Sequence, residues 1–174
     1  AAIYAAELSA LSADDASSAK LARRTGEIYA DLGQSVDALV WLRRAHEFEP
    51  ESRELFDAID ALLVKEARHA ERAALYRAAL DYRSDQDRLD ALHTIARLER
   101  VELSEPEKAI ETYRAALDVV DNDGKALDAL TELYTELGKD KDLSELYLRR
   151  AETADNGEQA APFRIALARL LRNK

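Results

Sequence analysis

Apolar side chains recur three and four residues apart along almost the whole chain, which is the spacing of one face of an α-helix. Residues 25–50 show the unit: two such stretches flank Leu32-Gly33, and Pro50 follows the second stretch. A glycine suits the left-handed cap that ends a helix, and a proline cannot continue one. The pattern therefore predicts a helical hairpin.

The same signals predict helices along the rest of the chain. The expected helices cover residues 1–11, 18–32, 35–48, 52–66, 68–82, 86–102, 105–119, 124–137, 142–154 and 162–172. Gly138, like Gly33, follows a Leu and is expected to end its helix. Ser104 and Glu107 have the spacing of a capping box before the helix 105–119, and Pro162 is expected to begin the last helix. Only five Gly and three Pro in 174 residues leave few places for strand turns, so the expected fold class is all-α.

Short sequences repeat at a nearly constant interval, so the hairpin is one unit of an array. The five residues 76–80 recur unchanged at 113–117, 37 positions later. Related sequences stand at 42–45 and 148–151, and a fainter copy stands at 4–8. We interpret residues 1–174 as a single α-α superhelix, or solenoid, of antiparallel helix pairs, with about four complete pairs and a half unit at each end.

A period near 34 with two helices per unit resembles the tetratricopeptide repeat (TPR), although other helical-hairpin repeats share this length. With Ala19 as position 1, the first unit carries that family's pattern at positions 8, 11, 15, 20, 27 and 32: Gly26, Tyr29, Gly33, Ala38, Ala45 and Pro50. Small residues at positions 8 and 20 let the two helices cross closely. Later units depart from the pattern, with Asp60, Arg97 and Thr131 at position 8 and Arg72 at position 20 of the second unit. The register of the second and third units stays open by one residue.

The resemblance implies a concave groove lined by positions 2, 5, 9 and 12 of each first helix. These positions hold Lys20, Arg23, Glu27, Ala30, Glu54, Asp57, Ala61, Val64, Ala91, Thr94, Leu98, Val101, Lys125, Asp128, Glu132 and Thr135. The groove is expected to be apolar in its middle and acidic on both sides, with a basic corner at Lys20 and Arg23. Such a surface suits a protein or peptide segment with apolar anchors and basic residues. The alternative is that these are solvated helix faces.

Composition narrows the possible partners. A net charge of −10 without a Lys-rich run argues against nucleic-acid binding. The apolar runs are far shorter than the roughly 20 residues that span a bilayer, so no membrane insertion is expected. Without Cys there is no disulfide or thiolate chemistry. A chain without Cys suits the cytosol and the periplasm alike, so the compartment stays unknown. The cytoplasm is slightly favoured.

No residue cluster predicts catalysis, a metal site or a cofactor. Glu66 and His69 have the Glu-x-x-His spacing of di-iron bundles, but that chemistry needs a second such motif, so we interpret them as a solvated pair. His93 falls on a packing position of its helix, and His46 has no ligand spacing to it. Phosphate-loop and nucleophile-elbow motifs are absent. We therefore expect a protein that is not an enzyme.

Arginines recur at one position of the second helices: Arg43, Arg77, Arg114 and Arg149. An acid follows the first three of them by four residues, which favours ion pairs within each helix over a stripe that binds acidic partners. Trp41, the only Trp, is expected to pack at a junction between repeats.

The pattern as a whole favours a protein-interaction scaffold, and the alternative is a structural spacer or self-association module without a peptide ligand. Because the chain does not begin with Met, we interpret it as part of a longer protein. Both ends carry apolar side chains that the array leaves uncovered: Ile3, Tyr4, Leu8 and Leu11, and then Phe163, Ile165, Leu167, Leu170 and Leu171. We expect self-association through one end, with the C-terminal helix favoured. The identity of the partner is not encoded in any motif.

Overall fold

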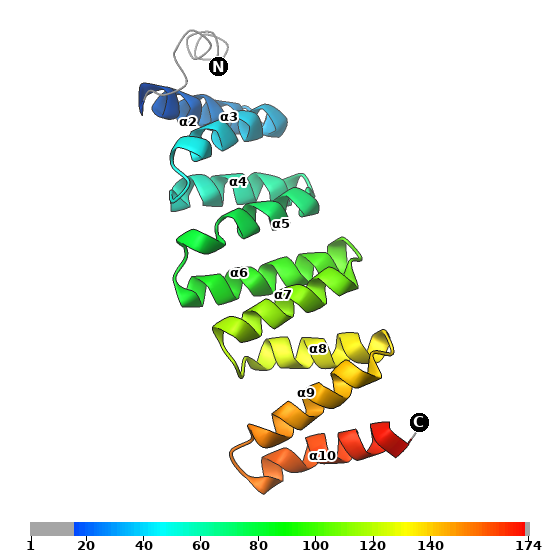
Figure 1. Cartoon of the computed structure of the whole chain (residues 1–174). Helices are drawn as coiled ribbons and strands as arrows, with labels where there is room; N and C mark the ends of the chain where they lie inside the picture. Colours follow the sequence, from blue (N-terminus) through cyan, green and yellow to red (C-terminus); the bar gives the residue numbers. More distant parts are fainter. Residues whose placement is uncertain (1–15, 173–174) are drawn as a thin grey trace. The chain divides into compact units, whose positions relative to one another are not determined.

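The computed structural model describes residues 16–172, and this part of the chain is helical without a strand (Figure 1). The chain divides into two compact units, residues 1–83 (unit 1) and residues 84–174 (unit 2). The expected helix 1–11 lies outside the described residues. The all-α prediction is confirmed.

The described part of unit 1, residues 16–83, forms two antiparallel hairpins. Their helices are α2 (Ala16–Asp31), α3 (Ser35–Phe48), α4 (Arg53–Lys65) and α5 (His69–Ala78), and a 3-10 turn, η1 (Leu80–Tyr82), follows α5. The helices bury one face each around a core that includes Leu39, Leu42, Ile59 and Leu63.

Unit 2 contains two further hairpins and one additional helix. Its elements are α6 (Asp85–Arg97) with its π-helical continuation η2 (Leu98–Glu102), α7 (Pro106–Val119), α8 (Gly124–Glu136), α9 (Asp140–Glu152) and α10 (Gly157–Arg172). We call α2, α4, α6–η2, α8 and α10 the A helices, and α3, α5, α7 and α9 the B helices.

Each of the four A helices from α2 to α8 ends on a residue in the left-handed conformation. Gly33 and Gly138 have φ angles of 73° and 63°, as the sequence predicted. Ala67 takes the equivalent place in the second hairpin with φ 52°, and Ser104 takes it in the third with φ 54°. The repeat is therefore visible in the backbone conformation as well as in the sequence.

The expected capping box at Ser104 is wrong. Since Ser104 ends η2 in the left-handed conformation, it does not cap α7. Glu105 is the residue before α7 and makes no side-chain capping bond, and Pro106 occupies the first helical position. Proline is well suited there, because the first amides of a helix have no partner within it.

The π-helical segment η2 moves the register of the third A helix by one residue. It accommodates one extra residue, and the N–H of Leu103 donates to the carbonyl of Leu98 across five residues at 3.0 Å. As a result Ala96 is buried at the hairpin crossing, and Arg97 is exposed. The third hairpin therefore has the small residue that its sequence seemed to lack at position 8.

The last helix begins five residues earlier than expected, at Gly157. The Asn156 side chain accepts hydrogen bonds from the backbone N–H groups of Glu158 (3.1 Å) and Gln159 (3.0 Å), which fixes the helix start. Pro162 lies inside α10 and not at its beginning. Because proline has no N–H, the carbonyl of Glu158 lacks its usual donor four residues later in the helix.

Candidate functional site

In unit 1 the predicted groove positions belong to the A helices α2 and α4. Lys20, Glu54, Asp57, Ala61 and Val64 are exposed. The other predicted positions, Arg23, Glu27 and Ala30, are half-buried. An arginine connects the two helices: Arg23 donates from Nε to Glu27 at 3.1 Å and from Nη2 to Glu54 at 2.5 Å.

These ion pairs change the expected charge of the surface. The hydrogen bond with Glu54, followed by that with Glu27, raises the pKa of the Arg23 guanidinium. Glu27 also forms an ion pair with Arg24, with an N–O distance of 3.3 Å. Asp57 is different, because it makes no ion pair within the described residues. Its exposed carboxylate is therefore free to meet a ligand.

In unit 2 the structure keeps some predicted positions at the surface and removes two. Thr94 is half-buried, and Val101, Lys125, Asp128, Glu132 and Thr135 are exposed. Ala91 and Leu98 are buried at 1% and 0% exposure, so neither side chain can line a groove. The π-helical segment explains this correction, because it turns Asp90 and Arg97 outward in their place.

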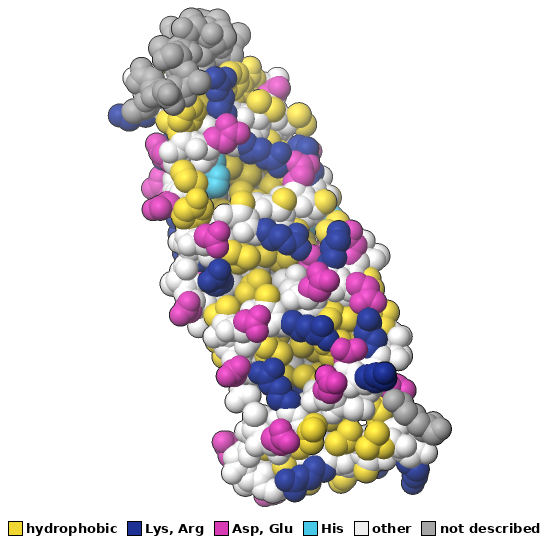
Figure 2. Space-filling view, in the orientation of Figure 1, with side chains coloured by type: hydrophobic (Ala, Val, Ile, Leu, Met, Phe, Trp, Pro, Cys, Tyr) yellow, Lys and Arg dark blue, Asp and Glu magenta, His cyan; other side chains and the backbone are white. Residues whose placement is uncertain are grey.

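Acids of α8 are paired with arginines from the neighbouring helices. Arg100 of η2 donates to Glu132 and Glu136, each at 2.8 Å. Arg150 of α9 lies 2.9 Å from the carboxylate of Asp128. Figure 2 shows the same mixture, with Lys and Arg beside Asp and Glu over the visible face. The acidic patches predicted on α8 are therefore compensated within unit 2.

A hollow of about 480 Å³ lies between α8, α9 and α10. Leu127 and Phe163 supply its apolar wall, and the Arg150 guanidinium stacks 4.3 Å from the Phe163 ring centroid. Asn122, Thr153 and Gln159 add polar groups. The sequence did not reveal this hollow, because it depends on the early start of α10.

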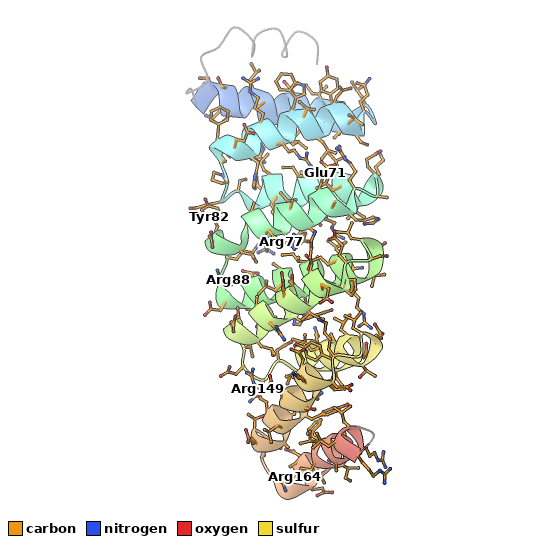
Figure 3. The ribbon with its side chains drawn as sticks, turned by 45° about the vertical axis from the view of Figure 1, so that its right-hand side comes forward. Glu71, Arg77, Tyr82, Arg88, Arg149 and Arg164 are labelled. Carbon is orange, nitrogen blue, oxygen red and sulfur yellow. The ribbon has the colours of Figure 1, made fainter. Side chains whose placement is uncertain are left out.

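Three of the recurring arginines, Arg43, Arg114 and Arg149, pair with acids outside their own helix, which corrects the prediction for these three. Arg43 of α3 binds Glu71 of α5 at 2.5 Å, and Arg114 of α7 binds Asp142 of α9 at 2.5 Å. Arg149 of α9 binds Asp121, in the loop between α7 and α8, at 3.1 Å. Figure 3 labels Glu71 on α5 and Arg149 on α9. A guanidinium can reach the next B helix of its unit, which a single-helix argument does not consider.

The histidines form no reactive cluster. His93 lies with Nε2 2.9 Å from Oδ1 of Asp123, an oxygen that also accepts the Ala126 N–H at 2.8 Å and caps α8. Among residues 16–172 no group of three or more His, Cys, Asp or Glu is placed to hold a metal ion. Within the same range no helix is long and apolar enough to cross a bilayer.

The comparisons with known proteins bear on the fold alone, through solved structures. No family model matches the sequence, and no curated protein matches it. A crystal structure of MamA is similar with a TM-score of 0.50 and 16% identity, over 95% of this chain and 87% of MamA. YrrB, described as a TPR protein with an unusual peptide-binding site, is similar with a TM-score of 0.47 and 14% identity, over 84% of this chain and 72% of YrrB.

At such low identity the likeness to MamA concerns the fold alone. It agrees with the helical hairpins of both units. By its fold, each of the two units is an all-α array of antiparallel helical hairpins, similar to the fold of MamA.

Proposed function

We propose that this chain is a protein-interaction scaffold, and that the exposed surface of its A helices binds a protein segment. The observation that carries this proposal is the row Glu54, Asp57, Ala61 and Val64 on α4. All four side chains are exposed, and Val64 is 50% exposed. A small residue and an aliphatic one beside an acidic pair form a shallow surface for an extended or helical segment.

The chemistry of this row favours a partner with basic residues. Glu54 is already held by Arg23, whereas Asp57 has no partner within the described residues. A Lys or Arg of the partner can therefore form a charge-assisted hydrogen bond with Asp57 without displacing an intramolecular one. Aliphatic side chains on either side of that basic residue would cover Ala61 and Val64.

Unit 2 offers a place for an apolar anchor. The hollow between α8, α9 and α10 has a wall of Leu127 and Phe163 and a volume of about 480 Å³. That volume is large enough for one bulky side chain. Arg150 lines the hollow and holds Asp128, so a basic group would have to compete with Arg150 for that carboxylate. We therefore assign the recognition of positive charge to Asp57.

The test is selection from a random peptide library displayed on phage, with the whole chain as target. Enriched peptides should carry Lys or Arg next to Leu, Ile or Val. Asp57→Lys should weaken their binding about tenfold, since losing a charge-assisted hydrogen bond costs about 1.5 kcal/mol. Glu111→Lys is the matched control, because Glu111 is exposed in the middle of the B helix α7. Peptides that bind Asp57→Lys as tightly as the wild type would refute the proposal.

A second candidate function is self-association through α10. Ile165 and Leu171 are 52% and 57% exposed on this helix, and apolar side chains gather over it at the bottom of Figure 2. Another copy of the chain could cover them. Light scattering over a concentration series should show association that is lost in Ile165→Gln/Leu171→Gln. A monomer at every concentration would exclude this candidate.

A further inference from the structure

A second hollow lies in unit 1 against α3, a B helix that carries none of the predicted groove positions. It has a volume of about 380 Å³. We call it the α3 hollow, and it is lined by Val36, Leu39, Val40, Arg43, Arg44, Glu47 and Arg68.

The apolar part of the α3 hollow is exposed to an unusual degree. Val36 and Val40 are 61% and 59% exposed, and their spacing of four residues puts them on one face of α3. The core needs neither of them, because α3 packs through Ala38, Leu39, Leu42 and Ala45. Adjacent exposed aliphatic side chains beside a hollow mark an interaction surface.

The charged part of the α3 hollow has three arginines against two carboxylates, Glu47 of the lining and the neighbouring Glu71, which is a surplus of positive charge in a chain whose net charge is −10. Arg43 and Arg68 share one carboxylate, that of Glu71. Arg44 lies 5.8 Å from the ring centroid of Trp41 and has no carboxylate partner among the described residues. Stacking on Trp41 orients the Arg44 guanidinium, and a planar guanidinium binds a carboxylate with two parallel hydrogen bonds.

We propose that the α3 hollow binds a protein segment that carries an aliphatic side chain next to one or two carboxylates. The aliphatic side chain packs between Val36 and Val40, and a carboxylate binds Arg44. Charge complementarity selects this occupant over a basic segment. The exposed valines select it over a nucleic acid, which would need several uncompensated cations and would gain little from aliphatic contacts.

The scaffold that we propose would thus have two surfaces that select opposite charges. A basic segment binds at Asp57 on the A helices, and an acidic segment binds at Arg44 on α3. This inference extends the proposed function, but it depends on a separate set of residues. The failure of one surface leaves the other standing.

The experiment uses the single tryptophan of the chain as a local probe. The peptide selection described above should yield a second class, rich in Leu or Val next to Glu or Asp. Because Trp41 stacks with Arg44, titration with these peptides should change Trp41 fluorescence and reach saturation. Basic peptides that bind at Asp57 should leave the Trp41 signal unchanged.

Variants decide between the possible occupants. Arg44→Glu should weaken the acidic peptides about tenfold, the effect of losing one charge-assisted hydrogen bond. Val40→Ser should also weaken them. Lys141→Glu is the matched control, because it makes the same charge change at an exposed residue of the B helix α9, outside the hollow. Asp57→Lys should leave acidic peptides bound, which separates this test from that of the proposed function.

Three results would overturn the inference. The first is a selection on the wild type that yields no acidic class. The second is self-association of the chain that Arg44→Glu abolishes, which would make a second copy the occupant. The third is single-stranded DNA that binds in competition with the acidic peptides and is unaffected by Val40→Ser, because the valines would then have no role.

Discussion

The two hairpins of unit 1 close in different ways at the same place in the repeat. In α2–α3 the crossing residue is Gly26, and a Cβ there would lie 2.7 Å from Cγ of Leu42. In α4–α5 the equivalent positions hold Asp60 and Arg72, which form a bidentate ion pair with distances of 2.6 and 3.0 Å. The helices of the first hairpin therefore cross closely because the residue at the crossing is small. The helices of the second hairpin are joined at the crossing by an ion pair.

The second crossing is supported by a network of neighbours. The Tyr76 hydroxyl donates to Asp60 at 3.2 Å, and its ring packs edge-on against Phe56 with centroids 5.0 Å apart. Arg83, just after η1, stacks 4.3 Å from the centroid of Phe56. A partly buried charge is tolerated only where its hydrogen-bonding atoms have partners. The comparison teaches that a repeat can exchange two small residues for an opposite-charge pair and keep its hairpin.

The largest expected effect is that of breaking this pair. Arg72→Ala leaves the Asp60 carboxylate without its main partner, in a site where both side chains are only 17% exposed. We expect the free energy of unfolding to fall by about 3 kcal/mol, at the lower end of the range for half of a buried ion pair. Urea denaturation followed by circular dichroism measures it.

The double variant separates the pair from its surroundings. Asp60→Ala/Arg72→Ala makes the second crossing as small as the first, so it should be more stable than Arg72→Ala alone. If the double variant loses the sum of the two single losses, the residues do not act as a pair, and the comparison between the hairpins fails.

A smaller effect is expected at the first crossing. Gly26→Ala gains about 1 kcal/mol of helix propensity but forces a methyl group against Leu42, and overpacking costs about 1 to 3 kcal/mol. We expect net destabilisation of about 1 kcal/mol in urea denaturation. The control is Gly124→Ala, because a Cβ at Gly124 meets nothing within 4 Å. A Gly26→Ala protein as stable as this control would mean that size does not govern the first crossing.

Sequence patterns predicted the parts of this molecule that depend on local chemistry. Helix period, and the glycines at Gly33 and Gly138, act within one or two turns of chain, and both predictions are confirmed. Asp60 and Arg72 were each recognised as departures from the repeat, but their pairing was not inferred. Two complementary departures at positions that meet in a hairpin were the signal for it.

The remaining errors concern features that arise between helices or inside the backbone. Whether an extra residue forms a π-helical segment depends on the packing on both sides of it, so Leu98 was placed in the groove although it is buried. The partners of Arg43 and Arg114 lie on neighbouring B helices. The residue types on the surface of the A helices could be predicted from the sequence. Which acids form ion pairs could not, and so it was not predicted that Asp57 has no partner.

The smallest expected effect is the loss of stability when a buried histidine of the first hairpin is protonated. His46 on α3 has a buried Nε2 without a hydrogen-bond partner, and burial lowers the pKa of its imidazole below the ordinary value of 6.5. The folded chain therefore binds this proton less readily than the unfolded chain. Its contribution to stability is complete above about pH 7 and is lost as pH falls below about 6.5 toward the folded-state pKa. The Arg72–Asp60 pair behaves oppositely, because the hydrogen bond with Asp60 raises the pKa of Arg72 and keeps it charged. Urea midpoints measured between pH 7.5 and 5.5 should fall less steeply for His46→Gln than for the wild type, since all other titrating groups are shared. Parallel slopes would mean that a proton on His46 is tolerated, and that the first hairpin can accept a charge as the second one does.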